Sequence, residues 1–478
     1  MKETFEFTAN IKKWLFIMMG TGLVGLAIVF LMYSGNGHAR FWTNILANVY
    51  YFTGIGLFGL FAVSAATIAY GGWHTLVKRI LLSLSGFTVI GGFLLLGILL
   101  LGYAHVHNLY EHVFEIVKDT TNNPSYTTKK VYFAPVFWIS RVAIYAVAWA
   151  FASWGLNNFF ARTDQTDPVV YKRAKLLAAS FIVLFALTES AISWDMIMSL
   201  DPHWYSTLFG WYNFASYGCA AWAMTILLVI FLKSQGYLER VNENHVHDLG
   251  KLLFGFSIFW TYLWFDQFML QWYANIPEET SFWVKRFNEG YFKFTIFFAL
   301  IVNFLFPLFF LIKRSAKRNF RMIGFGAALL IFGHYVDFFN YTFVEPNWNQ
   351  EAHEKEELAQ RKGDVAIFFA QYEGAEHETA VAEPAKGAEN ASVGEKAEVK
   401  EVKSEGNQKA EKAEGKEKGE GEEQEINYAG IGLGEILVFI GFLGAFLYMF
   451  FNNLKKRPII PENDPYLKEN EQLVVTWA

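Results

Sequence analysis

Apolar runs of about 20 residues recur along most of this 478-residue chain, and no other feature constrains its fold as strongly. At about 1.5 Å of rise per residue, one such run forms a helix that crosses a hydrocarbon core about 30 Å thick. The predicted spans are 14–33, 45–70, 80–102, 134–156, 174–196, 211–232, 252–272, 292–312, 321–343 and 430–451. The alternating strands of a membrane barrel are not seen in the sequence. It therefore predicts an all-α polytopic membrane protein with ten transmembrane helices.

Lysine and arginine are shared unevenly between the two sets of connections that ten helices create. The side that carries both termini holds 21 of them, and the short loops of the opposite side hold 6. Because basic residues are enriched in cytoplasmic loops, both termini are predicted to be cytoplasmic. The first run follows Lys2, Lys12 and Lys13 and is too long for the apolar region of a signal peptide, so we expect a transmembrane helix there.

The apolar runs divide the chain into four parts. Residues 1–343 form a nine-helix membrane region, 430–451 the tenth transmembrane helix and 452–478 a cytoplasmic tail. Between them, 344–429 is a low-complexity loop on the outer side, with 22 acidic and 11 basic residues. The excess of acidic over basic residues in this loop is larger than the net charge of −5 of the whole chain, so the acidity of the chain belongs to this loop. It has too few large apolar residues to offset the entropy of ordering, so we expect disorder or at most a fraying helix.

Seven ionisable residues inside the predicted spans or at their rims are placed in the outer half of the bilayer: Lys293 lies just inside the eighth span, and the other six are the candidate site residues. These six are Arg141, Glu189, Asp195, Asp266, His334 and Asp337. Each charge costs roughly 2.5–3.5 kcal/mol on insertion scales, so we expect these side chains to point inward and meet. The sequence leaves open whether Arg141 pairs with Glu189 or with Asp266. It also leaves two functions open, a proton path or quinol-headgroup site that opens outward and an ion-pair cluster that sets helix register.

Cysteine and histidine usage limits the cofactors that this chain can hold. Cys219 is the single cysteine, which excludes internal disulfides, iron–sulfur ligation and covalent haem attachment. His334 is the one histidine well inside a span, whereas a membrane haem b needs two axial imidazoles. We therefore expect neither a metal nor a redox centre in this chain. Nothing in the sequence indicates nucleotide or nucleic-acid binding.

Two long motifs at the outer ends of spans carry a family resemblance. The first is SWD at 193–195, continued by DPHWYST at 201–207, and the second is QWYANIPEET at 271–280. Both resemble the ActF subunits of alternative complex III, a bacterial quinol:cytochrome c oxidoreductase, and the resemblance covers most of residues 1–345. Asp201, Pro202, His203 and Trp204 carry over as signature residues of an outer loop, with no chemical role attached to them.

The resemblance implies a fold, a location and a set of partners. The fold would be an NrfD-like pair of four-helix bundles with two additional helices, in the bacterial cytoplasmic membrane. The partners would be lipids, the NrfD-like subunit ActC, a multihaem cytochrome and an iron–sulfur subunit, so that haem and iron–sulfur clusters lie outside this chain. A terminal oxidase as a further partner, and a quinone or menaquinone site in this chain, are left open. The implied role is a non-haem subunit that contributes to proton handling, quinone binding and assembly.

Two other classes of membrane protein compete with this interpretation. A secondary transporter would show inverted repeats and helices broken near the midplane, whereas Pro307 is the only clear proline in the middle of a span. A purely architectural subunit would use the same buried charges as ion pairs. It predicts that charge-removing variants fail to assemble.

Overall fold

A computed structural model describes residues 4–33, 38–118, 124–162, 167–201, 204–288, 290–362, 431–462 and 464–471. Within these ranges the regular elements are helices, apart from one isolated bridge between Thr4 and Pro458. Eight of the described helices are long and apolar enough to cross a membrane. The chain is an all-α, multi-pass integral membrane protein, as the apolar runs predict.

The membrane-length helices occur along the whole described chain. They are α1 (Ala9–Met32), α2 (Ala39–Ile68), α3 (Lys78–Leu84) with α4 (Thr88–Tyr103), α7 (Pro135–Arg162), α8 (Pro168–Met196), α9 (Leu208–Ser234), the first part of α15 (Phe320–Lys362) and α17 (Leu433–Leu454). The other α-helices are α5 (Glu111–Lys118), α6 (Pro124–Tyr132), α10 (Glu243–Ala274), α11 (Pro277–Asn288), α12 (Gly290–Leu300), α13 (Phe306–Phe310), α14 (Arg314–Arg318) and α18 (Leu467–Glu471). A 3₁₀ turn, η2 (Met198–Leu200), follows α8, and a π-helical turn, η3 (Ile301–Leu305), joins α12 to α13.

Several boundaries differ from those expected of the sequence. The helix α10 and the shorter apolar helix at 294–310 lie where the seventh and eighth spans are predicted, but they are not among the eight. The helix α15 continues to Lys362, beyond the expected boundary at 343, and Pro346 does not end it. The rest of the acidic loop, from residue 363 to 429, lies outside the described residues, as do residues 472–478 of the tail.

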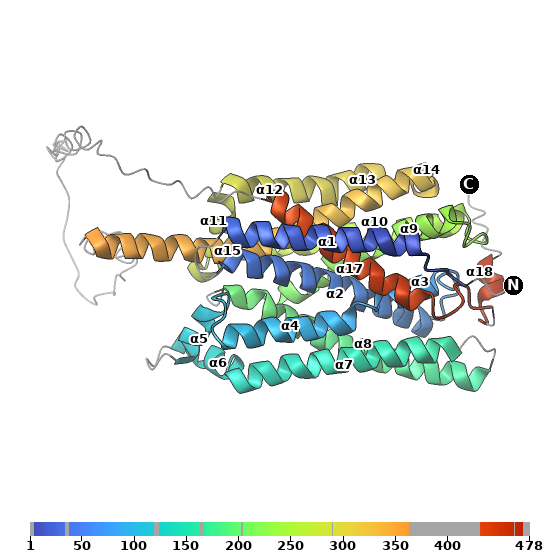
Figure 1. The fold of residues 1–478 in the computed structure, drawn as a ribbon, viewed down its shortest axis with the longest axis horizontal. Helices are drawn as coiled ribbons and strands as arrows, with labels where there is room; N and C mark the ends of the chain where they lie inside the picture. The colour runs from blue at the N-terminus through green and yellow to red at the C-terminus, as the bar shows by residue number, and fades with distance from the viewer. Residues whose placement is uncertain are drawn as a thin grey trace, which may run out of the picture. The chain divides into compact units, whose positions relative to one another are not determined.

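Contacts between the helices define two ends of the membrane region, residues 1–350 and 430–478. The start of α1 and the end of α17 lie at the same end, which we call the terminal end (Figure 1). The end of α7 reaches it through Asn157 and Arg457, and the start of α8 through Tyr171 and Tyr466. The opposite end, the distal end, therefore holds the starts of α2, α7 and α17 and the last turns of α8. The helices α2 and α9 are the most deeply buried of the eight.

The helix α1 is the least buried of the eight, and its glycines hold it against α17. The two helices lie side by side (Figure 1). A Cβ atom built on Gly22 would lie 2.4 Å from Gly441 Cα, so neither position has room for a side chain. Close backbone approach at small residues is the usual way in which helices associate inside lipid, where burial of apolar surface gives no advantage.

Replacing Gly22 with leucine should therefore detach α1 from α17. The new side chain would collide with backbone atoms, and such overpacking typically costs about 1–3 kcal/mol. Gly20→Leu is a matched control on the same helix, because a Cβ there meets no atom within 4 Å. Thermal unfolding of the detergent-solubilised protein should show a lower melting temperature for Gly22→Leu alone. Equal melting temperatures of the two variants would contradict the glycine contact.

The π-helical turn η3 comes directly before Pro307. Proline has no N–H and its ring clashes with the carbonyl oxygen four residues back, so the α-helical pattern is interrupted there. The turn buries Asn303, and neither amide atom of this side chain has a hydrogen-bond partner. A Cβ on Gly333 would collide with Asn303 Oδ1, so the unsatisfied amide lies against the residue that precedes His334. π-helical turns are frequent at functional sites.

Candidate functional site

The buried ionisable residues that the sequence singled out in α7, α8 and α15 lie toward the distal end. Asp195 and Glu189 lie in the last turns of α8, Arg141 in the first turns of α7, and His334 and Asp337 in the distal half of the apolar part of α15. Glu189, Asp195, His334 and Asp337 are all at most 5% exposed. The structure separates these residues into three groups, which differ in how their charge is compensated.

The first group surrounds Asp337, whose carboxylate accepts three hydrogen bonds. Trp260 Nε1 and Ser216 Oγ donate to Oδ2 at 3.0 and 3.1 Å, and the Tyr212 hydroxyl donates to Oδ1. These donors come from α9 and α10, so three helices meet at this carboxylate. Among the described residues, no cation forms an ion pair with it. A buried carboxylate that is well hydrogen-bonded but lacks a counter-ion is a group that can exchange a proton.

His334 belongs to the same group. Its Nδ1 lies 3.0 Å from Ser216 Oγ, and its ring packs edge-on against Trp260 at 5.3 Å between centroids. Since the Ser216 hydroxyl donates to Asp337, its oxygen is left to accept a hydrogen bond from His334 Nδ1–H. This donor count assigns the Nδ1–H tautomer and makes Nε2 the basic nitrogen. His334 Nε2 is buried and has no hydrogen-bond partner within the described protein.

The second group surrounds Glu189 on α8. Ser190 donates to its Oε2 at 3.2 Å, whereas Oε1 is buried without a hydrogen-bond partner in the described chain. The hydroxyl groups of Tyr50 and Tyr217 lie close to this carboxylate, and the Tyr217 hydroxyl is within hydrogen-bonding reach of it, although neither hydroxyl forms a hydrogen bond of good geometry in the described chain. Three unsatisfied polar groups around one buried carboxylate are typical of a site that holds water. Tyr217 follows Ser216 on α9, so this helix connects the Glu189 group with the Asp337 group.

The third group is a closed ion pair between Arg141 and Asp195. The guanidinium donates from Nε to Oδ2 at 2.9 Å and from Nη2 to Oδ1 at 2.6 Å. Its Nη1 donates to the Tyr132 carbonyl at 3.2 Å, and its Cζ atom lies 3.9 Å from the centroid of the Tyr132 ring. Burial, and secondly the charge of Asp195, raises the pKa of the Tyr132 hydroxyl. The partner of Arg141 is thus neither Glu189 nor Asp266, the two residues that the sequence left open.

The remaining candidates from the sequence lie apart from these groups. Asp266 is half-buried on α10 and makes no hydrogen bond or ion pair with a described residue. Asp201 is buried just after η2, and Trp204 stacks on Phe282 of α11 at 3.9 Å, so the first motif packs against the helix that begins within the second motif. Pro202 and His203 lie outside the described residues.

A cleft of about 250 Å³ lies beside the first motif. Aromatic side chains and Met198 make up half of its lining and polar side chains the other half, and such a combination suits a planar small molecule. The residues that define it are Lys129, Tyr132, Trp194, Asp201, Trp204 and Tyr205, among others. Burial lowers the pKa of Lys129, and the nearby carboxylate of Asp201 partly opposes that shift.

Sequence reasoning missed two buried ion pairs, Arg40–Glu435 and Lys78–Asp464, the second of which joins α3 to the segment after α17 at 2.9 Å. Arg40, in the first turn of α2, donates to Glu435 of α17 at 2.7 Å, and both side chains are at most 7% exposed. A ladder of amides continues along α2, because Asn44 donates to the Arg40 carbonyl and Asn48 to the Asn44 carbonyl, each at 2.9 Å. Asn48 also donates to the Tyr335 hydroxyl at 3.3 Å. Glu435 lies inside the last predicted span, 430–451, and this buried acidic residue is the sequence signal from which the Arg40–Glu435 pair could have been suspected.

The described residues contain no cluster of three or more histidine, cysteine, aspartate or glutamate side chains that could hold a metal ion. No protein-family model matches the chain, and no curated protein matches it. The resemblance in the two motifs therefore stays a prediction, and the functional argument rests on the buried groups themselves.

Proposed function

We propose that this chain is a non-haem membrane subunit of a quinol-oxidising respiratory complex of the alternative complex III type, in which it handles protons. The observation that supports this most directly is the Asp337 group, where a buried carboxylate without a counter-ion is linked through Ser216 to His334. Chains of carboxylate and histidine inside membranes commonly serve as proton relays. The architecture that goes with this proposal has ten spans, an NrfD-like pair of bundles and both termini in the bacterial cytoplasm.

The proton would pass between groups that alternate as acceptor and donor. His334 Nε2 accepts a proton in the membrane interior, and Nδ1–H can then pass one to Asp337 through the Ser216 hydroxyl. Glu189, with its unpartnered Oε1 and the two tyrosine hydroxyls, is the next group toward the end of α8. Water at the unsatisfied atoms would connect the two groups across α9.

The cleft beside the first motif supports the quinone part of the proposal. A quinone ring is planar and apolar, and it would need a few polar groups for its two carbonyl oxygens. Trp194 Nε1 and Trp204 Nε1 are both buried without hydrogen-bond partners in the described chain, and both residues line this cleft. A quinone or menaquinone headgroup is therefore the ligand that we propose for it.

The architectural function is the second candidate, and a specific observation favours it. Arg141–Asp195 joins the consecutive helices α7 and α8, and Arg40–Glu435 joins α2 to α17, which are far apart in sequence; both ion pairs are largely buried. Such pairs can fix the register of helices without any catalytic role. The partners would still be ActC, a multihaem cytochrome and an iron–sulfur subunit, and the haem and iron–sulfur clusters would lie in those subunits. This chain would hold the partner subunits in place.

Purification through a tag on the C-terminus tests membership of the complex. The chain has one cysteine and cannot attach haem c, so reduced-minus-oxidised c-type bands in the eluate must come from a copurified cytochrome. We expect strong c-type bands that stay with the tagged chain through size exclusion in mild detergent. The matched control is the same membrane extract from untagged cells. A featureless spectrum from intact, monodisperse protein would overturn the proposal and favour a secondary transporter.

A further inference from the structure

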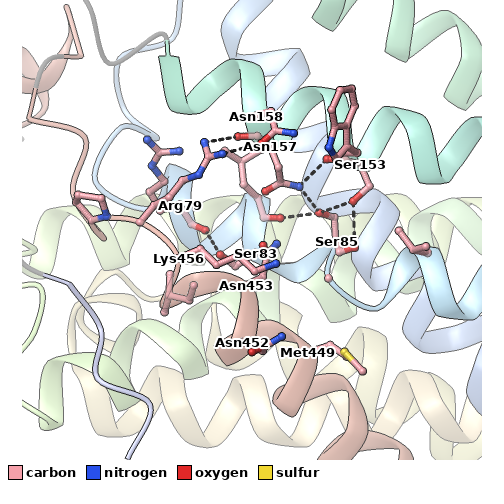
Figure 2. A pocket seen from close by; sticks show the side chains of 17 residues that line it. Arg79, Ser83, Ser85, Ser153, Asn157, Asn158, Met449, Asn452, Asn453 and Lys456 are labelled. Atoms are coloured by element: carbon pink, nitrogen blue, oxygen red, sulfur yellow. Dashed lines mark hydrogen bonds between the residues drawn. The ribbon is translucent and has the colours of Figure 1, made fainter.

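We propose that a polar pocket at the terminal end binds the phosphate headgroup of an anionic phospholipid. The pocket has a volume of about 270 Å³ and lies between the α3–α4 turn, the end of α7 and the end of α17 (Figure 2). Its chemistry differs from that of two other cavities, which are lined mostly by apolar side chains. This inference does not depend on the proposed function in the respiratory complex.

Three basic residues line the pocket, and the described lining includes no acidic one. They are Arg79 of α3, which is 5% exposed, and Lys456 and Arg457, which follow α17. Positive charges gathered around a cavity with no nearby carboxylate in its lining favour an anion. Arginine and lysine together are typical of phosphate recognition, because the first binds through a planar fork and the second as a point charge.

Hydrogen bonds connect the elements that form the walls of the pocket. Arg457 donates to the Asn157 carbonyl at 2.8 Å and to Asn158 Oδ1 at 2.7 Å, which fixes the segment after α17 against α7. Between α7 and the α3–α4 turn, Asn157 Nδ2 donates to Ser85 Oγ at 2.8 Å, and Ser153 Oγ lies 3.1 Å from the same oxygen (Figure 2). These contacts join α7 both to the segment after α17 and to the α3–α4 turn.

Two of the walls become more polar toward the terminal end, and this change favours a lipid over a free anion. On α17 the order is Met449, then Asn452 and Asn453, then Leu454, and Lys456 follows the helix. On α7 it runs from Trp154, which is 68% exposed, to Asn157 and Asn158. A phospholipid has the same order, with acyl chains, glycerol esters and a phosphate. Basic pockets between transmembrane helices are a known mode of anionic headgroup binding.

The close approach that shapes the pocket leaves no room for a side chain at Gly86. A Cβ there would lie 2.8 Å from the Met449 carbonyl oxygen, so the α3–α4 turn contacts the backbone of α17 directly. The glycine thereby brings Arg79 and Lys456 to the same cavity from segments more than 300 residues apart.

Charge reversal at Lys456 tests the site with a matched control next to it. Lys456 lines the pocket, whereas the adjacent Lys455 is also exposed but does not line it and lies over the Phe7 ring. Both variants, Lys456→Glu and Lys455→Glu, change the net charge equally and alter an exposed side chain, so we expect both to fold. The full chain would be purified in detergent and titrated with phosphatidylglycerol, with phosphatidylcholine as a neutral lipid, and followed by thermal shift and native mass spectrometry.

We expect phosphatidylglycerol to bind the wild-type chain and Lys455→Glu alike, and to bind Lys456→Glu about tenfold more weakly, since a charge-assisted contact is lost. Equal weakening in both variants would show nonspecific electrostatic attraction and overturn the site. In a second titration, inorganic phosphate replaces the lipid. If it binds as tightly as the lipid with the same dependence on Lys456, the pocket takes free phosphate and the lipid assignment is wrong.

Discussion

Replacing Asp337 with asparagine is expected to lower turnover of the assembled complex about 100-fold, the lower end of the range for loss of a general acid–base group. The variant keeps the size of the side chain, but an amide cannot take up or release a proton at neutral pH. Its amide can still satisfy the surrounding donors, because the oxygen can face Trp260 and Ser216 while the NH₂ group faces the Tyr212 hydroxyl oxygen. We therefore expect normal assembly together with low turnover.

Asp266→Asn is the matched control for this experiment. It makes the same chemical change in a carboxylate that is half-buried and makes no hydrogen bond with a described residue. Turnover would be measured as quinol oxidation by the purified complex, with subunit composition checked on the same sample. Full activity in an assembled Asp337→Asn complex would rule out a role for this carboxylate in the proton path. Loss of assembly would instead support the architectural function.

The helices could be predicted from sequence because lipid leaves the chain few alternatives. A backbone that crosses a hydrocarbon core must satisfy its own hydrogen bonds, so each long apolar run becomes a helix. The helix ends were harder to place. The ninth span was predicted to end at 343, yet α15 continues through Pro346 to Lys362. A proline near the lipid boundary is tolerated in a helix where neighbouring groups or solvent satisfy the freed carbonyl.

The candidate site could be predicted in part. Glu189, Asp195, His334 and Asp337 stand out because an ionisable side chain inside an apolar run is rare. Tyr212, Ser216 and Trp260 do not, because hydroxyl and indole groups are ordinary in membrane helices and give no signal until three helices bring them to one carboxylate. The relay through Ser216 is thus a property of packing.

Pairing was the least predictable feature. Arg40 and Glu435 are separated by 395 residues, and Arg40 precedes its predicted span, so it counted as a loop residue. Arg141 pairs with Asp195, near the end of α8, because the first turns of α7 lie beside the last turns of α8. Which of several carboxylates meets an arginine depends on the rotation of each helix about its axis, and hydropathy does not contain that information.

Removing one member of the Arg141–Asp195 pair should destabilise the protein more than any other single change at this site. Arg141→Met leaves the fully buried Asp195 without its counter-ion, and breaking a buried pair in this way typically costs about 3–5 kcal/mol. Asp195→Leu should cost a similar amount. The double variant should recover most of the loss, because replacing both charges with apolar groups of similar size is often neutral.

A double-mutant cycle on the melting temperature of the detergent-purified protein measures this coupling. Additive losses would show that the two side chains act independently and would contradict the bidentate contact. Turnover of the double variant then separates the two functions of the buried charges. If stability and turnover both return, the pair only fixes α7 against α8, and proton handling belongs to the Asp337 and Glu189 groups. If stability returns and turnover does not, the charge of Asp195 is itself part of the path, and the path reaches the distal end of α8.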